Sequence, residues 1–264
     1  RAHGWGTERP EGRMVALVGD AEMDEGNIFE AILEGWKQGV RNCWWIIDYN
    51  RQSLDAVVRE GLWARYEALF REFGWDVVIL KYGVLLEAAF KEPGGDRLRK
   101  WIDECPNQLY SALVFQGGAA WRRRLNDDIG DQGAVTRLIE ARSDEELAAL
   151  MPHLAGHDLP TLLDAFAAND HDRPTCFIAY TIKGFGLPLA GHKDNHAGLM
   201  NPGQIAALRE SMGIAEGAEW EPWAGLGGNS VEAVKAVVES TRIARARRDR
   251  AWNVAEVPAI EPPA

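Results

Sequence analysis

The stretch MVALVGDAEMDEGNIFEAILEGWKQGVRNCWWIIDYN, residues 14–50, has the pattern of a strand, a helix and a second strand in direct succession. The short apolar run Met14–Val18 is typical of a buried parallel strand, and Cys43–Asp48 repeats the pattern. Parallel neighbours need a crossover between them, so the stretch predicts a βαβ unit. The crossover is a helix expected over residues 22–38, with a shared apolar face at Ile28, Ala31, Ile32 and Gly35.

The alternation of strands and helices continues along the chain. Further strands are expected at Trp75–Leu80 and Thr175–Tyr180. Helices are expected at 62–73, 85–90, 96–104, 158–168, 203–212 and 230–251. Residues 105–133 permit no clear prediction, whereas Ser143 and Glu146 form a capping box before the apolar Leu147–Leu150. The predicted fold class is therefore α/β, with a parallel sheet flanked by helices.

The domain organisation follows from the same pattern. We expect residues 1–215 to form one α/β domain, and residues 216–264 to form a C-terminal helix and a Pro-rich linker that includes Pro258–Ala264. The chain opens with Arg, and its first strand follows almost at once. We therefore expect a piece of a longer polypeptide, with the first part of the α/β domain missing.

Composition narrows the class of protein. The formal net charge of −11 argues against non-specific binding to nucleic acid or to an anionic membrane. No apolar run approaches the ~20 residues that span a bilayer. The three cysteines are scattered without a CxxC pair, which favours a reducing cytoplasm.

The residues that follow each strand are the candidates for chemistry, because open parallel sheets bind ligands at the carboxyl ends of their strands. Gly19–Glu22 is a tight strand-to-helix turn with Asp20 at its tip, where free N–H groups suit an anion such as a diphosphate. An acid beside a phosphate group needs a bridging cation, and Mg²⁺ prefers carboxylate and phosphate oxygens. Asn50, after the neighbouring strand, and the carbonyl of Gln52 offer further oxygen ligands.

These motifs resemble a known family. Gly19-Asp20, then Glu25-Gly26, then Asn50 is similar to the signature of thiamine-diphosphate enzymes, and residues 19–55 resemble the transketolase superfamily throughout. GDAEMDE and the Asn-x-Gln-x-Leu-Asp pattern at 50–55 resemble more narrowly the homodimeric type of pyruvate dehydrogenase, in its decarboxylating first component. Gly156-His157-Asp158 and AYTIKGFG at 179–186 continue the similarity, which covers roughly residues 12–215.

The resemblance implies a thiamine diphosphate and Mg²⁺ site. Its metal ligands would be Asp20, Asn50 and the carbonyl of Gln52. The backbone of Gly19, Ala21 and Glu22 would contact the diphosphate, and Lys183 would neutralise its charge. Ala21 replaces the usual Gly of the family, which the site tolerates if this residue keeps a negative φ.

Three further residues receive roles from the resemblance. His196 would lie on a mobile loop and take part in substrate chemistry or in reductive acyl transfer. Glu25 and Glu30 match a pattern in which acids of two subunits meet and share protons across a dimer. From the residues alone, His196 is equally a plain loop residue, and both glutamates are equally solvated helix residues.

The predicted function is decarboxylation of a 2-oxo acid such as pyruvate, with transfer of the acyl group to a lipoyl acyltransferase partner. The family also needs a Glu from a second α/β domain, which would come from the rest of a longer polypeptide or from a partner chain. The alternatives are a transketolase that moves two-carbon units between sugar phosphates and a non-catalytic cofactor-binding or assembly module.

Overall fold

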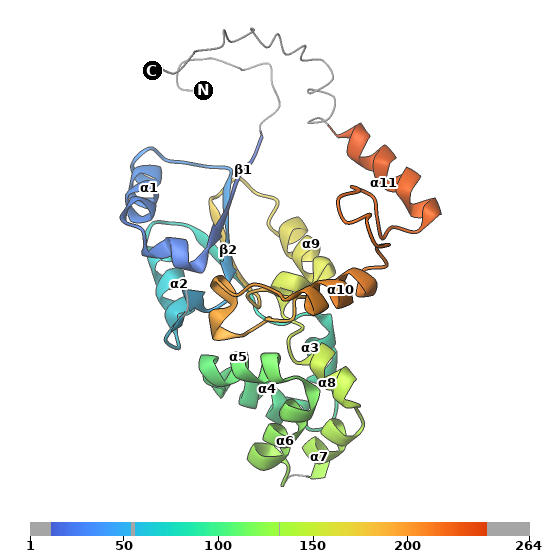
Figure 1. Cartoon of the computed structure of the whole chain (residues 1–264). Coiled ribbons are helices and arrows are strands. Elements are labelled where there is room, and N and C mark those ends of the chain that lie inside the picture. Colours follow the sequence, from blue (N-terminus) through green and yellow to red (C-terminus); the bar gives the residue numbers. More distant parts are fainter. Residues whose placement is uncertain (1–11, 54–55, 132, 242–264) are drawn as a thin grey trace, which may run out of the picture. The chain divides into compact units, whose positions relative to one another are not determined.

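A computed structural model describes residues 12–53, 56–131 and 133–241 of the chain (Figure 1). The chain forms two compact units, Arg1–Met200 and Asn201–Ala264. The predicted domain boundary after residue 215 stays a prediction. The parts of the predicted tail that fall on 242–251 and 258–264 lie outside the described residues.

The first unit is built on a four-stranded sheet whose strands all run parallel. The order is β1 (Met14–Gly19), β2 (Cys43–Tyr49), β6 (Thr175–Tyr180) and β5 (Asp76–Leu80). Every residue of β6 is buried, because this strand has a neighbour on each side and a packed layer on each face. The predicted α/β class with a parallel sheet is confirmed.

The prediction that the first strand is buried is wrong. Met14 and Leu17 of β1 are 71% and 74% exposed, and only Val18 of this strand is buried. The physical reason is the extent of the helical layers. Among the described residues α2 and α9 pack over the centre of the sheet, whereas β1 lies at its edge, so most of the apolar side chains of β1 lack a covering layer.

Helices cover both faces of the sheet. Successive side chains of β6 point alternately to one face and to the other. Cys176, Ile178 and Tyr180 belong to one apolar cluster, together with Phe70 of α2 (Leu62–Glu72). Phe177 and Ala179 belong to a second cluster, against which Leu162, Ala165 and Phe166 of α9 (Leu159–Ala168) pack. The predicted helices 62–73 and 158–168 therefore form the two layers that enclose the centre of the sheet.

The crossover helix is shorter than predicted. Residues Asp20–Asp24 form a separate 3-10 helix, η1, and Glu25 adopts an extended backbone before α1 (Gly26–Lys37) begins. On the predicted apolar face Ile32 is fully buried, whereas Ala31 is exposed. The face is only partly used because α1 lies beside the sparsely covered edge strand β1 (Figure 1).

Of the helices between β5 and β6, six pack into one helical block (Figure 1). They are α3 (Val84–Ala89), α4 (Gly95–Glu104), α5 (Asn107–Gln116), α6 (Gly118–Ile129), α7 (Gly133–Glu140) and α8 (Asp144–Leu150). The predicted capping box is confirmed, since Glu146 N–H donates to Ser143 Oγ at 3.1 Å and Ser143 N–H donates to Glu146 Oε2 at 2.6 Å. Helices α5 and α6 occupy the region for which the sequence permitted no clear prediction.

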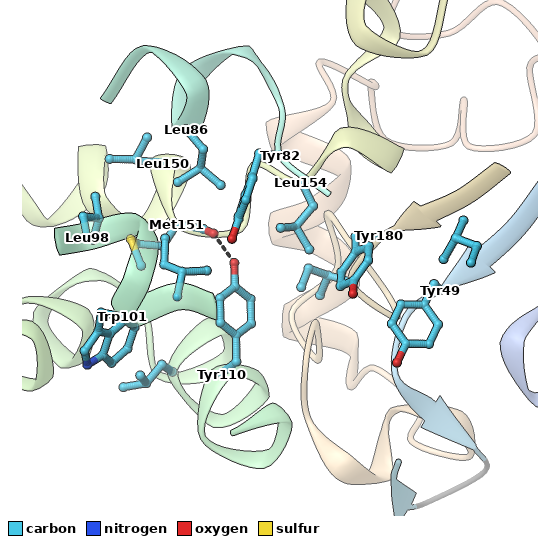
Figure 2. Close-up of a cluster of buried hydrophobic side chains, with 14 of the residues drawn as sticks. Tyr49, Tyr82, Leu86, Leu98, Trp101, Tyr110, Leu150, Met151, Leu154 and Tyr180 are labelled. Carbon is cyan, nitrogen blue, oxygen red and sulfur yellow. Dashed lines mark hydrogen bonds between the residues drawn. The ribbon is translucent and has the colours of Figure 1, made fainter. Parts of the chain in front are cut away.

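The helical block is joined to the sheet by a cluster of aromatic and aliphatic side chains (Figure 2). Trp121 of α6 is fully buried and meets Tyr110 of α5 edge to face, with ring centroids 5.1 Å apart. The Tyr110 hydroxyl donates a hydrogen bond to the Met151 carbonyl. Tyr110 thereby lies on the side of the block that faces Tyr180 and Tyr49, at the carboxyl ends of β6 and β2.

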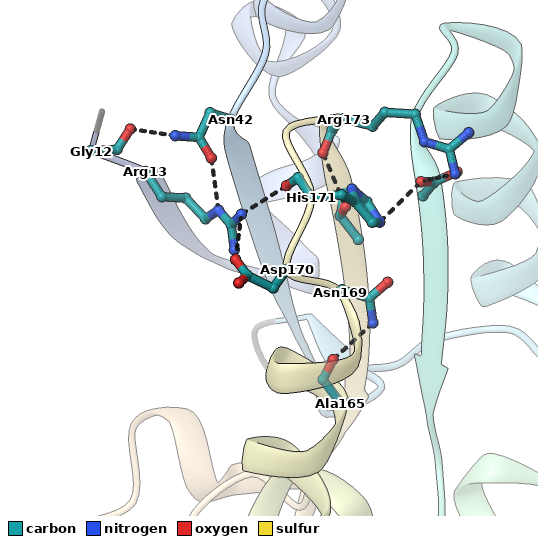
Figure 3. A network of polar contacts seen from close by, with 10 residues as sticks. Gly12, Arg13, Asn42, Ala165, Asn169, Asp170, His171 and Arg173 are labelled. Carbon is teal, nitrogen blue, oxygen red and sulfur yellow. Dashed lines mark hydrogen bonds and ion pairs between the residues drawn. The ribbon is translucent and has the colours of Figure 1, made fainter. Parts of the chain in front are cut away.

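The opposite, amino-terminal end of the sheet is tied by polar contacts (Figure 3). Arg13 donates to the Asn42 side chain at 3.0 Å and to the His171 carbonyl at 2.7 Å, and its guanidinium lies 4.0 Å over the Trp44 ring. Arg173 forms an ion pair with Asp76 at 2.7 Å. These contacts connect the starts of β1, β2, β5 and β6, so the strands are held in register where they begin.

The second unit contains α10 (Pro202–Ser211) and α11 (Gly228–Ser240). A capping box starts α10. Gln204 N–H donates to Asn201 Oδ1 at 2.9 Å, and Asn201 N–H donates to Gln204 Oε1 at 2.9 Å. The predicted helix 203–212 is confirmed. The predicted helix 230–251 is confirmed as far as Ser240. Over the described ranges, every helix is too short or too polar to traverse a lipid bilayer.

Candidate functional site

Three turns meet at the carboxyl end of the sheet. Gly19 pairs with Asp48, and Asp48 pairs with Ala179, so β1, β2 and β6 end at nearly the same level. The turn after β1 carries Asp20, the turn after β2 carries residues 50–52, and the turn after β6 carries Lys183. This is the edge at which the sequence analysis expected ligand binding.

Asp20 is buried beside the turn that follows β2. Its side chain is among the least exposed polar groups of the chain, at 2%. One carboxylate oxygen, Oδ2, accepts a hydrogen bond from the Arg51 N–H at 2.7 Å. The other, Oδ1, has no hydrogen-bond partner among the described residues. Tyr66 donates to the Asp20 carbonyl at 3.0 Å and fixes the backbone of the turn.

The Asp20 carboxylate is electrostatically unfavourable as it stands. Burial raises the pKa of Asp20 to about 6, and the nearby Asp48 carboxylate adds to this rise, while the N–H groups of Arg51 and Ala21 and the Arg51 charge oppose it. An unpaired, buried carboxylate oxygen costs free energy unless a cation or a donor reaches it. The donor set therefore fits a divalent cation, whose charge would lower this pKa.

The turn after β2 supplies neutral oxygen atoms. Asn50 Oδ1 accepts a hydrogen bond from Gln52 N–H at 2.9 Å, which forms a compact turn and leaves a second lone pair on that oxygen. Arg51 has a left-handed backbone with φ of 68°, so the chain reverses sharply here. Gln52 then enters the short strand β3 (Gln52–Ser53), which pairs with β4 (Ala56–Val57). Asn50 and the Gln52 backbone thus lie next to Asp20.

The turn after β1 already binds one carboxylate of its own. The Gly19 N–H donates to Glu22 Oε2 at 2.6 Å. Among the described non-glycine residues, positive φ values occur at Asn42 and Arg51 and not at Ala21. The alanine that replaces the usual glycine is therefore unstrained, which meets the condition that the sequence analysis set for it.

The turn after β6 brings Lys183 and His196 together. Lys183 Nζ lies 3.3 Å from His196 Nδ1, and the Asn195 side chain donates to the Lys183 carbonyl at 2.6 Å. Gly184 has φ of 71°, and a Cβ there would collide with the Asn195 amide. The glycine therefore permits the reversal that folds the short 3-10 helix Lys193–His196 back onto Lys183.

His157 contacts the loop that follows β6 and holds its backbone in place. Its Nε2 accepts a hydrogen bond from Ile182 N–H at 2.8 Å, and its ring stacks on Phe185 with centroids 3.8 Å apart. Burial lowers the pKa of His157, which favours the neutral ring that such an acceptor needs. Gln52 adds a second tie, because its side chain donates to the Gly191 carbonyl at 3.2 Å.

The sequence of the chain is similar to those of several known proteins. Over 188 residues the chain is 28% identical to the pyruvate dehydrogenase E1 component of Buchnera aphidicola, which covers 70% of this chain and 21% of that protein. The E1 component of Corynebacterium glutamicum is 29% identical over 65% of this chain and 18% of its own length. The E1 component of Cupriavidus necator is 28% identical, over 75% of this chain and 22% of its own length.

The chain is similar in sequence to the pyruvate dehydrogenase E1 component. The predicted resemblance is thereby confirmed, and the chain spans about a fifth of the length of the curated relatives it matches. A solved transketolase mutant from Pichia stipitis has a TM-score of 0.41 and 14% identity, covering 90% of this chain and 24% of that one. No protein-family model matches the chain.

Two predicted site residues of this E1-like chain lie away from the turns. Glu25 precedes α1 and Glu30 lies within it, and both side chains are exposed. No hydrogen bond or ion pair joins either side chain to another described residue. They share the surface of α1 with Phe29 and Trp36, which are 44% and 60% exposed. The subunit-interface role of both glutamates stays a prediction.

Sequence reasoning missed several residues that shape the candidate site. Arg51 supplies the N–H that holds Asp20, and its side chain is 6% exposed. Tyr66 anchors the Asp20 backbone, and Thr181 donates to the Asp48 carboxylate. Arg51 had a visible signal, because it stands between Asn50 and Gln52 in the motif. Tyr66 and Thr181 had none, since their contacts depend on packing between distant segments.

Proposed function

We propose that this chain carries the diphosphate- and Mg²⁺-binding part of a thiamine-diphosphate-dependent enzyme that decarboxylates a 2-oxo acid such as pyruvate. The observation that carries the proposal is the buried Asp20 oxygen without a partner, held against the Asn50–Gln52 turn. The relation to pyruvate dehydrogenase E1 components supports it independently. When bound, the cofactor would supply the electron sink for loss of CO₂.

The residues present can hold the metal. Asp20 would offer Oδ1, Asn50 its side-chain oxygen, and Gln52 its carbonyl, which leaves further positions for diphosphate oxygens and water. Mg²⁺ prefers this mixture of one carboxylate and neutral oxygens when phosphate groups complete its shell. Asp20 would be ionised with the cation present, because the positive charge would lower the pKa that burial raises.

The diphosphate would lie over the turn after β1. The N–H groups of Ala21 and Glu22, at the start of the 3-10 helix η1, would orient it, and Lys183 would balance its charge. Gly19 N–H would contact the diphosphate only after the Glu22 carboxylate leaves it. Glu22 thus acts as a built-in competitor for one predicted diphosphate contact.

Lys183 and His196 would have different roles. With Lys183 drawn to the diphosphate, His196 Nδ1 would lose its neighbour and become available to hold or move a proton near the substrate. The acyl group would pass to a lipoyl acyltransferase, and Glu25 and Glu30 would lie at the contact with a second subunit. A second α/β domain would supply the Glu that activates the cofactor, and the assembled enzyme would work in the cytoplasm.

Isothermal titration calorimetry tests the metal and diphosphate site directly. Inorganic diphosphate is titrated into the chain with and without Mg²⁺, because this probe does not need the second domain. We expect saturable binding with Mg²⁺ and binding at least about tenfold weaker without it. Equal heats in both buffers would contradict the proposed site.

The reaction is tested after the chain is combined with a relative's remaining domains. Loss of CO₂ from pyruvate, with no two-carbon transfer from xylulose 5-phosphate, is the expected result. Transfer from the sugar phosphate alone would favour the transketolase alternative. Mg²⁺-dependent binding of thiamine diphosphate without any turnover would favour a non-catalytic cofactor-binding module.

A further inference from the structure

A small cavity of about 70 Å³ lies between the carboxyl ends of the strands and the helical block. Residues from both parts line it, including Tyr49, Arg51, Lys81, Asp103, Tyr110 and Tyr180. Figure 2 shows Tyr110 of the block facing the Tyr49 and Tyr180 rings across this region. The cavity adjoins the Asn50–Gln52 turn, since Arg51 belongs to both.

Arg51 is a buried cation with little compensation. Its side chain is 6% exposed, and its guanidinium makes one hydrogen bond, from Nη2 to the Thr181 carbonyl at 3.3 Å. Its Nε has no partner, and no ion pair to Arg51 occurs within the part of the chain that the structure describes. The rings of Tyr110 and Tyr180 lie 4.7 Å and 5.7 Å from the guanidinium carbon.

The other charged residues around the cavity have partners of their own. Lys81 Nζ and the Tyr82 hydroxyl both donate to Asp103 Oδ1, so this carboxylate balances Lys81. Glu60, on the exposed side, accepts a hydrogen bond from Asn107 N–H at 3.1 Å. Among the described residues no carboxylate contacts the Arg51 guanidinium directly, and a buried guanidinium without a contacting anion is costly.

We propose that this cavity binds the carboxylate group of a small monocarboxylic acid, with the Arg51 guanidinium as its principal partner. A planar guanidinium is the side chain best suited to a carboxylate, because its parallel N–H groups match the two oxygens. The volume, set against about 30 Å³ for one water molecule, accommodates an acid the size of formate or acetate. The inference does not require the proposed function.

Occupancy would influence the predicted metal site. The backbone N–H of Arg51 holds Asp20 Oδ2, and its guanidinium faces the cavity residues. An anion that restrains the Arg51 side chain would also restrain the turn between Asn50 and Gln52. The cavity and the metal site are therefore adjacent, and the same residue connects them.

Formate binding to the full chain tests the proposal. Formate is titrated by calorimetry without Mg²⁺ or cofactor, at constant ionic strength set with sodium chloride. The variants are Arg51→Met and, as a matched control, Arg99→Met, since Arg99 stacks on the Tyr82 and Phe90 rings nearby. We expect saturable binding by the native chain and the control, and binding at least about tenfold weaker in Arg51→Met.

Two results would overturn the proposal. One is the absence of saturable formate binding by the native chain, seen also as unbroadened ¹³C-formate NMR signals, and this result does not depend on any variant. The other is sulfate binding as tight as formate binding, which would indicate a general anion effect. Because no metal or cofactor is present, failure here leaves the proposed function untouched, and failure of diphosphate binding leaves this site untouched.

Discussion

Two carboxylates near the carboxyl end of the sheet differ in how the chain treats them. Asp20 is 2% exposed, has one oxygen without a partner, and its pKa is raised by burial to about 6. Asp103 keeps 46% of its side chain exposed and accepts from Lys81 and Tyr82. Burial acts to raise the pKa of Asp103 too, but these donors outweigh it and the net shift is downward.

The difference distinguishes Asp103, which has a structural role, from Asp20, which is a candidate ligand-binding residue. The chain itself supplies a cation and a hydroxyl to Asp103, so this carboxylate stabilises the fold in its ionised form. No cation within the described residues forms an ion pair with Asp20, and the nearby Arg51 charge does not offset its burial, so its ionised form costs stability until a cation binds. A buried acid that the protein leaves unpaired is a candidate for function for this reason.

The largest expected effect concerns diphosphate binding. Replacing Asp20→Asn removes the only predicted charged metal ligand, so Mg²⁺-dependent diphosphate binding should weaken by roughly 100-fold or more. Asp103→Asn should leave that binding within about twofold, because Asp103 already serves Lys81. Calorimetry on both variants measures the contrast. Similar losses in the two variants would break the distinction between these acids.

The pH dependence of stability should have opposite signs for the two acids. The pKa of Asp20 is raised from 3.8 in the unfolded chain to about 6 in the folded chain. Protonated Asp20 therefore favours the folded state, and this stabilisation is complete below pH 3.8 and is lost as the pH rises to about 6. The loss is on the order of 3 kcal/mol. Asp103, with its lowered pKa, stabilises at neutral pH and loses this effect as the pH falls.

Urea unfolding without metal, from about pH 3.5 to about pH 7, measures this dependence, because the range spans the unfolded and the folded pKa of Asp20. In Asp20→Asn the stability should no longer decline between about pH 4 and pH 6. Added Mg²⁺ should restore stability to the native chain above about pH 6, and not to the variant. Because Asp103 contributes the opposite slope, the deciding comparison is with the variant, and native and Asp20→Asn profiles of the same shape would show that Asp20 titrates normally.

Two lysines provide a smaller contrast. Lys183→Met should weaken diphosphate binding by about tenfold through loss of its point charge, with the free energy of unfolding nearly unchanged. Lys81→Met should leave diphosphate binding intact and lower stability, because it leaves Asp103 without its cation. Calorimetry and urea unfolding of both variants separate the two roles. The reverse pattern would assign Lys183 to the fold.

The smallest effect is the cost of removing Asp103 itself. Asp103→Asn should lower the free energy of unfolding by about 1 kcal/mol, a value kept small because solvent screens this partly exposed pair. Asp24→Asn, in the same 3-10 helix as Asp20 but exposed, is a control that should change stability by less than about 0.5 kcal/mol. Urea unfolding at neutral pH detects the difference. An equal change in both variants would mean that the Lys81 contact contributes nothing.

Much of the sheet and the candidate site could be predicted from sequence because the relevant signals are local. Apolar runs such as Thr175–Tyr180 mark strands, and parallel strands end together, so Asp20 and the Asn50–Gln52 turn were expected at one edge. The same logic failed for Met14–Val18, whose apolar run does not reveal whether a strand is central or at an edge. The helical block between β5 and β6 was only partly visible, since residues 105–133 lack a regular apolar period.

The sequence by itself determined the α/β order of elements, the turns that carry Asp20, Asn50 and Lys183, and the relation to E1 components. Only the tertiary structure decided the exposure of β1, the approach of His196 to Lys183, and the burial of Arg51 beside Tyr110. The physical reason is range. Strand and turn preferences act over a few neighbouring residues, whereas burial and unpaired charge depend on which distant segments pack together.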